Sequence, residues 1–227
     1  MIHSIILARG GSKGIKGKNL KHVGGKPLLF WSINASLKSK KIFKTWVSSD
    51  SKKILDYSLD CGANIIKRPK KISTDIASSE TAWVHAIKFI EKNFQIETVV
   101  GIQPTSPIKS GKDFDDAIKD FSKKKYDSLF SSCLIKDYCV WEKNKSFKAL
   151  YDYKKRKRRQ EFKEKYLENG SFYIFNKKKF LMKNNRLFGN IGTFKQNKLK
   201  SFQIDDFEDL FIVDTLLMSN KNKKFLR

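Results

Sequence analysis

The sequence predicts an α/β fold in which helices cover both faces of a mostly parallel β-sheet. Short apolar runs, long enough for strands, alternate along most of the chain with stretches whose apolar residues recur at helical spacing. Of the 227 residues, 40% are hydrophobic and 18 are Phe, so the chain can bury a sizeable core without disulfide or metal staples. We therefore expect one domain spanning residues 1–227.

In the first half of the chain, we expect strands at 3–8, 43–49 and 63–67, and helices at 27–38, 51–60 and 79–93. The first strand contains Ile5, Ile6 and Leu7 in succession, which is typical of a strand buried on both faces. Pro27 suits the first turn of a helix, where a backbone N–H is not needed. The last of these helices carries its large apolar side chains on one side.

In the second half, we expect strands at 98–103, 128–134 and 171–175, and helices at 112–123 and 206–218. Pro104 and Pro107 end the first of these strands because proline cannot donate to a sheet. The alternation breaks over 136–168, where the sequence is basic, aromatic and irregular. We expect this stretch to be a small segment inserted within the domain.

The formal net charge of +25 raises the possibility of nucleic-acid binding. Only seven of the 48 cations are Arg, however, and the Lys residues are scattered over the whole chain. The charge is densest over 143–166, with eleven cations against three acids, and such runs are usually solvated surface. We therefore keep a nucleic-acid-binding protein only as a less favoured alternative.

Other features narrow the class of protein further. No stretch approaches the apolar length of a membrane span, and the N-terminal apolar run is too short for a signal peptide. The three cysteines show neither zinc-site spacing nor a disulfide framework. We expect a cytoplasmic protein without membrane contacts.

A glycine-rich, cationic loop follows the first predicted strand. It reads RGGSKGIKGKN from Arg9 to Asn19, and such a loop can fold its backbone amides around a phosphate group. Arg9, Lys13 and Lys18 could neutralise phosphate oxygens. The loop matches neither the P-loop pattern nor GxGxxG, so a merely flexible polar loop is the alternative.

The order of motifs is more specific than any one of them. The chain contains ARGGSKGIKGKN, GGKPLLFWSINAS, VSSD, KRPKKISTDIASS, IQPTSPIKSG, RRQEFKEKYLENGSFYIF and IDDFEDL in succession. This series resembles the acylneuraminate cytidylyltransferases over nearly the whole chain. The resemblance implies a Rossmann-like sheet of the nucleotidyltransferase type, with 136–168 as a flap that forms a homodimer.

The resemblance also implies roles for individual residues. The nucleotide would be bound by Leu7, Ala8, Arg9, Gly11, Ser12, Lys13, Lys18, Asn19, Arg68, Asp75, Ser78 and Ser79. The sugar would be bound by Gln103, Thr105, Ser106, Arg159, Gln160, Asn169 and Tyr173. The catalytic residues would be Arg9, Lys18 and Asp205, with Lys18 stabilising the leaving pyrophosphate and Asp205 binding Mg²⁺.

Several of these residues also have a purely structural interpretation. Ser78 and its neighbours could simply cap the helix that follows. The segment QPTSP could be only a turn shaped by its two prolines, and Arg159 could be one more charge in a basic run. We expect Asp206 to be an N-cap rather than a metal ligand, because it points away from Asp205 in an extended segment.

The chain also departs from the family pattern. The common Leu-Pro after the Arg-Gln pair is absent, and Leu167-Glu168 stands where relatives carry a basic residue. Many relatives show Asp-x-Asp where this chain has Gln203-Ile204-Asp205. Gln203 offers an oxygen without a charge, so we expect Mg²⁺ to depend more on the triphosphate.

Taken together, the sequence predicts an enzyme that activates a nonulosonic, sialic-acid-like sugar. The anomeric hydroxyl would attack the α-phosphorus of CTP with Mg²⁺ present, giving a CMP-sugar and pyrophosphate. The alternative is a relative that binds CTP or a nucleotide sugar with weak or no activity. Which nonulosonic acid is the acceptor stays open.

Overall fold

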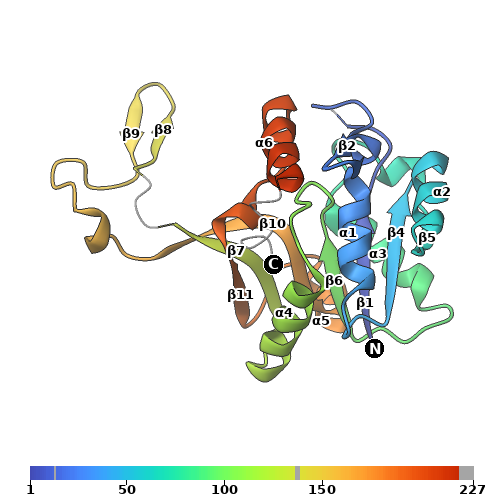
Figure 1. Ribbon diagram of the computed structural model, residues 1–227. Helices are drawn as coiled ribbons and strands as arrows, with labels where there is room; N and C mark the ends of the chain where they lie inside the picture. The colour runs from blue at the N-terminus through green and yellow to red at the C-terminus, as the bar shows by residue number, and fades with distance from the viewer. Residues whose placement is uncertain (13, 136–138, 220–227) are drawn as a thin grey trace.

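A computed structural model describes residues 1–12, 14–135 and 139–219. Within these residues the chain forms a central seven-stranded sheet, in the order β11-β7-β10-β6-β1-β4-β5 (Figure 1). Its strands are β1 (Ile2–Leu7), β4 (Lys44–Ser49), β5 (Asn64–Lys67), β6 (Thr98–Ile102), β7 (Ser128–Ile135), β10 (Lys165–Asn176) and β11 (Ile191–Gln196). Only β10 runs antiparallel to its neighbours within the described sheet, which confirms the expected mostly parallel sheet.

Helices lie on both faces of this sheet. They are α1 (Leu28–Leu37), α2 (Lys52–Asp60), α3 (Ser79–Ile90), α4 (Gly111–Lys123), α5 (Lys177–Lys183) and α6 (Phe207–Met218). Successive side chains of a strand point to opposite faces, so Ile6 packs with α1, α2 and α4, whereas Ile5 packs with α3 and α5. Short 3₁₀ turns occupy Lys18–Leu20, Lys70–Ile72, Arg159–Glu161 and Lys198–Ser201. In the described residues, no helix combines the length and apolar character that a membrane crossing requires.

The last helix packs at one end of the molecule against the first part of the chain. A third apolar cluster joins Ile15 and Val23 of the N-terminal region to Ile204 and Val213. Two short strands, β2 (His22–Val23) and β3 (Lys26–Pro27), form a small antiparallel pair beneath α6. The Gly24 amide between them donates a hydrogen bond of 2.8 Å to Asp214 of α6.

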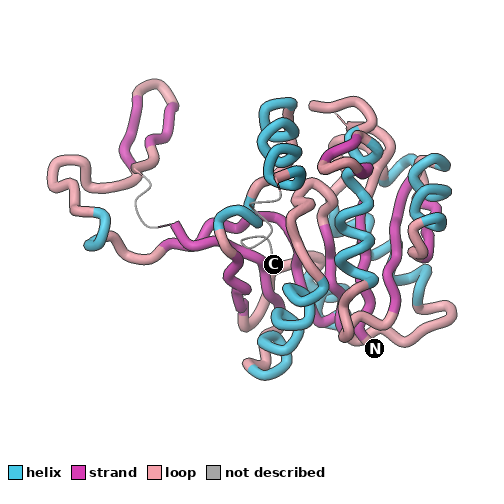
Figure 2. The backbone as a smooth tube through the Cα atoms, viewed as in Figure 1, coloured by secondary structure: helices cyan, strands magenta, loops and turns pink. Residues whose placement is uncertain are grey.

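An arm projects from the body between β7 and β10 (Figure 2). It contains an antiparallel hairpin of β8 (Trp141–Lys143) and β9 (Phe147–Ala149). The Trp141 ring contacts Tyr151 and Tyr153, with ring centroids 5.9 and 5.6 Å apart. These aromatic side chains stay close to one another rather than joining the core of the sheet.

The structure contains each strand and helix expected from the sequence, with shifted ends. The largest shift is in β10, which begins at Lys165 rather than at residue 171. Its first residues pair with β7 outside the core, so they lack the apolar pattern on which the expectation depended. We did not predict α5, β11 or the hairpin, which are short or lie at an edge of the fold.

Candidate functional site

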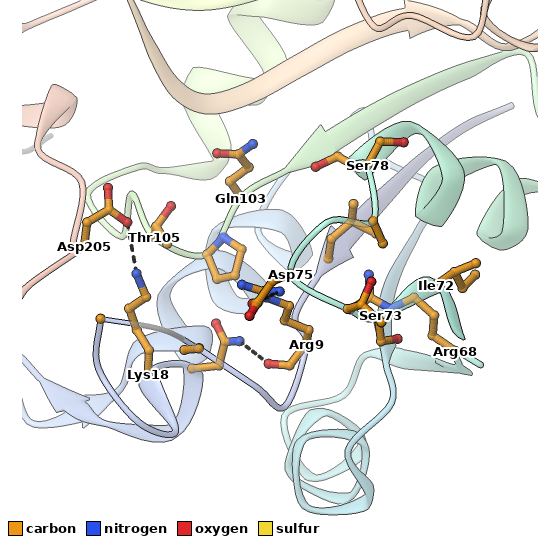
Figure 3. A pocket seen from close by; sticks show the side chains of 18 residues that line it. Arg9, Lys18, Arg68, Ile72, Ser73, Asp75, Ser78, Gln103, Thr105 and Asp205 are labelled. Atoms are coloured by element: carbon orange, nitrogen blue, oxygen red, sulfur yellow. Dashed lines mark hydrogen bonds and ion pairs between the residues drawn. The ribbon is translucent and has the colours of Figure 1, made fainter. Parts of the chain in front are cut away.

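The carboxyl ends of the central strands open onto a cavity of about 490 Å³ (Figure 3). Segments that follow β1, β5 and β6 form most of its wall, which is where ligands bind in open α/β sheets. The lining residues are Leu7, Arg9, Ser12, Gly14, Lys18, Asn19, Arg68, Ile72, Ser73, Thr74, Asp75, Ala77, Ser78, Ser79, Gln103, Pro104, Thr105 and Asp205.

Most of the side chains predicted from the sequence meet at this cavity. They are Leu7, Arg9, Ser12, Lys18, Asn19, Arg68, Asp75, Ser78, Ser79, Gln103, Thr105 and Asp205. Ser78 lines the cavity, and its side chain also accepts a hydrogen bond from the Thr81 amide as the N-cap of α3. The geometry therefore brings together motifs that are up to about 200 residues apart.

The glycine-rich loop is held by the protein on both sides. Gly10 N donates to Asp50 Oδ1 at 2.8 Å, and Asn19 Nδ2 donates to the Arg9 carbonyl oxygen at 2.9 Å. At Gly14, an added Cβ would lie only 2.2 Å from the Asp205 carbonyl oxygen. Gly14 thus permits a close approach between the loop and the segment that carries Asp205. The interpretation of the loop as a phosphate-binding loop did not predict this contact.

Two cations of the loop pair with acids at opposite ends of the cavity. Lys18 Nζ donates to the Ile204 carbonyl oxygen at 2.7 Å and to Asp205 Oδ1 at 3.0 Å. Arg9 forms an ion pair of 2.5 Å with Asp75 (Figure 3). Both acids would compete with an anionic ligand for these cations, so ligand binding would exchange one set of ion pairs for another.

Arg68 is a buried cation whose guanidinium lacks partners. The residue is 6% exposed, and its Nε and Nη2 atoms make no hydrogen bond to the described residues. Burial lowers the pKa of Arg68 and Arg9 lowers it further, while the negative charge of Asp50 works in the opposite direction. A buried, unsatisfied guanidinium at a cavity wall is well suited to a phosphate or carboxylate.

The predicted sugar residues divide into two groups. Gln103 and Thr105 line the cavity, whereas Ser106, Asn169 and Tyr173 are buried away from it. Ser106 Oγ donates to the Asn169 carbonyl oxygen at 3.4 Å. The Tyr173 ring packs against Trp83, with centroids 6.1 Å apart.

Asn169 uses the full hydrogen-bonding capacity of its side chain within the protein. Its Oδ1 accepts from Ser131 Oγ at 2.6 Å and from Ser171 N at 3.3 Å. Its Nδ2 donates to Gln196 Oε1 at 3.0 Å and to Ser201 Oγ at 3.2 Å. Because an amide offers two donors and two acceptor lone pairs, this arrangement favours a positioning role over direct contact with a sugar.

Gln203 lies two residues before Asp205. Its Nε2 donates to the Asn169 carbonyl oxygen at 2.8 Å, so its amide is already engaged with the protein. Asp206 accepts from Asp209 N at 2.9 Å in a capping box, which confirms it as the N-cap of α6. Asp205 and Asp75 are carboxylates that line the cavity, and the side chain of Asp205 is 72% exposed.

The residues at Asp205 fit a divalent cation that is shared with a substrate. In the part of the chain that the structure describes, no group of three or more His, Cys, Asp or Glu side chains could hold a metal by itself. Mg²⁺ commonly takes only one or two protein carboxylates and completes its shell with phosphates and water. One exposed carboxylate beside a cationic cavity meets that requirement.

The remaining predicted residues lie elsewhere. Ala8 is buried and Gly11 is not in the cavity wall, while Gln160 is exposed on the arm. Lys13 and the side chain of Arg159 lie outside the described residues. Several wall residues were not singled out as site residues from the sequence, although each lies within a motif quoted above: Gly14, Ile72, Ser73, Thr74, Ala77 and Pro104.

Comparison with known proteins gives a family match and named relatives. A family model described as "Cytidylyltransferase" matches residues 3–225. The chain is 34% identical to N-acylneuraminate cytidylyltransferase A of Danio rerio over 203 residues, covering 87% of this chain and 46% of that protein. It is 28% identical to the N-acylneuraminate cytidylyltransferase of Streptococcus agalactiae, covering 98% of this chain and 56% of that protein. This chain thus spans about half the length of these relatives.

A relative of matching length and two solved structures extend the comparison. The chain is 30% identical to post-translational flagellin modification protein B of Campylobacter coli, with 93% of each chain covered. CMP:2-keto-3-deoxy-manno-octonic acid synthetase complexed with CTP superposes with a TM-score of 0.70 at 16% identity, covering 95% of this chain and 98% of the other. The 4-diphosphocytidyl-2C-methyl-D-erythritol synthase of Anaerococcus prevotii superposes with a TM-score of 0.65 at 17% identity, covering 96% of this chain and 98% of the other. At this identity both structures show a shared fold.

Proposed function

Since this chain belongs to the cytidylyltransferase family, we propose that it transfers CMP from CTP to a nonulosonic, sialic-acid-like sugar acid. The single observation that supports this most is Arg68, whose buried guanidinium has two unpaired nitrogen atoms beside the cavity. Arg68 and Arg9 line the same cavity as Ser78 and Ser79 at the N-terminus of α3, and this combination suits an anionic nucleotide. The relatives named N-acylneuraminate cytidylyltransferases supply the substrate class.

In the proposed reaction, the anomeric hydroxyl of the sugar acid attacks the α-phosphorus of CTP. The new bond between oxygen and phosphorus forms as the bond to pyrophosphate breaks, and the hydroxyl proton is lost. Arg9 and Lys18 would exchange their present acidic partners for phosphate oxygens, and Lys18 would meet the charge that grows on the leaving pyrophosphate. Gln103 and Thr105 would orient the sugar from the opposite wall.

Asp205 would hold Mg²⁺ together with the triphosphate. The ion would supply charge neutralisation at the α-phosphate and the leaving group. Asp205, the proposed metal ligand, lies 3.0 Å from Lys18, the cation that would face the leaving group. Gln203 contributes an amide rather than a second carboxylate, so the protein's share of the metal site is small.

We also propose that the chain works as a homodimer through the arm. Two of the predicted sugar-binding residues, Arg159 and Gln160, lie in the arm's 3₁₀ turn, away from the cavity of the same chain (Figure 1). They could contact a sugar acid only if a second copy brought its arm to that cavity. The exposed side chains of Trp141, Phe147 and Tyr153 give the arm an apolar surface suited to such a contact.

The reaction can be tested by measuring pyrophosphate release with Mg²⁺ and CTP. The acceptor panel would contain neuraminic, legionaminic and pseudaminic acids and Kdo, and ATP, GTP and UTP would serve as nucleotide controls. We expect release with CTP and one nonulosonic acid. A folded protein that binds CTP but releases no pyrophosphate with any acceptor would contradict the proposed activity.

One observation favours a second candidate, a relative that binds the nucleotide with little turnover. Gln203 stands two residues before Asp205 and carries no charge, so this segment offers one carboxylate where two would bind a metal more firmly. This candidate predicts CTP binding that does not depend on Mg²⁺. Isothermal calorimetry with and without EDTA separates it from the enzyme.

We further retain the prediction of a cytoplasmic protein. It is supported by the cysteines of the described chain, Cys61, Cys133 and Cys139, which are free thiols.

A further inference from the structure

Lys109 lies behind the cavity wall and joins two strands that meet there. Its Nζ donates to the Gln103 carbonyl oxygen at 2.8 Å and to the Ser171 carbonyl oxygen at 3.1 Å. Gln103 follows the end of β6, whereas Ser171 lies in β10, next to Gly170 at the bulge of that strand. One side chain therefore links the two backbones on which the acceptor side of the cavity is built.

The ammonium group of Lys109 lies in an environment that disfavours its positive charge. Both of its hydrogen bonds within the described chain go to neutral carbonyl oxygens rather than to a carboxylate. Burial lowers the pKa of Lys109 to about 7, although the negative charge of Asp113 works in the opposite direction. A Lys held this way destabilises the fold relative to an apolar side chain, which points to a use other than stability.

The nearby acid, Asp113, is committed to other groups. Both of its carboxylate oxygens accept from Lys200 Nζ at 2.8 Å, and Oδ2 also accepts from the Ser110 amide at 2.8 Å. Lys200 is almost completely buried and is the natural partner of this carboxylate. Asp113 with Lys200 therefore forms a complete ion pair, and Lys109 is left to serve the two carbonyl groups.

The two carbonyl groups control where the Gln103 side chain lies. Gln103 N also donates to the Ser171 carbonyl oxygen at 3.2 Å, so its whole peptide unit is fixed against β10. Gly170 has a φ of 59°, and a Cβ there would lie 3.1 Å from both Gln103 Oε1 and Gln203 Nε2. The side chains of Gln103 and Gln203 thus both lie close to Gly170, the residue before the Ser171 carbonyl group that Lys109 binds.

Neighbouring contacts extend this junction to the metal side of the site. Ser106 Oγ donates to the Asn169 carbonyl oxygen, and Ile204 N donates to the Thr105 carbonyl oxygen at 2.8 Å. Lys109 therefore holds the start of the loop 103–106, and hydrogen bonds to Asn169 and Ile204 hold the rest of it. Loss of the first contact would free the one residue of this loop that faces the acceptor with a side-chain amide.

We propose that Lys109 is a positioning residue that fixes the Gln103 side chain against Gly170 for recognition of the acceptor sugar. This inference rests on the proposed function, because it assumes that the acceptor binds at Gln103. It assigns Lys109 no contact with substrate. Its effect should therefore appear in the acceptor KM and leave the CTP site largely unchanged.

The test compares Lys109→Met, Lys109→Arg and wild type, with Lys112→Met as the matched control. Lys112 lies three residues away on α4, and its exposed side chain pairs with Asp116. We expect Lys109→Met to raise the acceptor KM about tenfold, as expected for the loss of about 1.4 kcal/mol of hydrogen bonding, with the CTP KM within about twofold. Lys109→Arg should restore the acceptor KM because a guanidinium can donate to both carbonyl groups.

Hydrogen exchange on the ligand-free protein gives a readout that does not require activity. Lys109→Met should speed exchange of the amides at 103 and 170–172, while those of β1 and β4 keep their wild-type rates. Unchanged exchange there, or equal increases in both KM values, would overturn the proposal. If wild type turns over no acceptor, the proposed function fails, and the exchange experiment still decides whether Lys109 positions Gln103.

Discussion

At the scale of single residues, one cation of the site lacks hydrogen-bond partners within the described residues, and two others pair with acids that an anionic ligand would have to replace. Arg68 has buried nitrogen atoms without hydrogen-bond partners in the described chain, and Arg9 and Lys18 pair with acids of the same cavity. An unpaired buried charge lowers the free energy of unfolding, whereas an anion that reaches it gains a strong, charge-assisted contact. The free protein thus gives up stability at the place where binding occurs.

We predict that Arg68→Met stabilises the free protein and strongly weakens nucleotide binding. Removing the unpaired charge should raise the free energy of unfolding by about 1 kcal/mol, because an apolar side chain fills the same buried site. CTP affinity should fall on the order of 100-fold. Thermal melts with and without CTP measure both effects, and Arg158→Met on the exposed arm is the control. A lower melting temperature for free Arg68→Met would contradict this account.

Lys18 should act mainly on the rate. The charge on the leaving pyrophosphate grows toward the transition state, so Lys18→Met should lower kcat about 100-fold or more and change the CTP KM much less. Steady-state kinetics with Lys16→Met, an exposed residue of the same loop, as control would show this. A large rise in KM at unchanged kcat would instead assign Lys18 to ground-state binding.

At the scale of elements, the start of α3 is fixed by an ion pair that the sequence did not reveal. Arg186 donates to both carboxylate oxygens of Glu80, at 2.7 and 3.1 Å, and its guanidinium lies 5.0 Å from the Trp83 ring and 4.9 Å from the Tyr173 ring. Burial opposes ionisation of Glu80, but the hydrogen bonds and charge of Arg186 outweigh it and hold the pKa of this carboxyl below its usual value. The pair thereby holds the helix whose first residues line the cavity.

We predict that Glu80→Gln lowers the free energy of unfolding by about 2 kcal/mol at pH 7, because it leaves the Arg186 charge without its partner. Since the pKa of Glu80 is lowered by folding, its contribution is present above the ordinary Glu pKa of about 4.3 and is lost as the pH falls through the lowered value. Urea unfolding at pH 7 and at pH 3.5 should show the difference between wild type and variant shrinking in acid. A difference that stays constant over this range would mean that the pair contributes nothing through its charge.

The elements that the sequence predicted well are those whose pattern follows from burial. Strands such as β1 and β6 are buried on both faces, and their apolar runs leave little choice of structure. The bulge at 169–172 of β10 could not be predicted in this way, because it depends on Ser131, Gln196 and Ser201, which lie in three other segments. For the same reason, the sequence suggested Asn169 as a sugar contact, whereas the structure shows its amide committed to protein partners.

At the scale of the whole molecule, the sequence could locate the cavity of the body but could not predict the position of the arm. The cavity could be located from the sequence because most of its wall follows the predicted strands β1, β5 and β6. The arm was recognised only as an interruption, since its direction depends on where β7 and β10 leave the sheet (Figure 1). The positions of Arg159 and Gln160 relative to the cavity could therefore not be known without the fold.

Deleting the arm tests the proposed dimer. A variant in which a short Gly-Ser linker replaces 140–163 should keep the fold of the body, because the aromatic side chains of the arm contact one another rather than the core. We expect light scattering to show a dimer for wild type and a monomer for the variant, together with loss of turnover and retention of CTP binding. A variant that remains a dimer would remove the proposed role of the arm.

The contact of Lys18 with Ile204 and Asp205 joins groups 186 and 187 residues apart, and it has a consequence for how the molecule matures. Closing so large a loop is entropically costly, so this contact forms only when the intervening sheet already holds its two ends near each other. A newly made or refolding chain should therefore acquire secondary structure and a packed core before it gains a working cavity. During its assembly the molecule would pass through a stage that is nearly native in shape and catalytically silent.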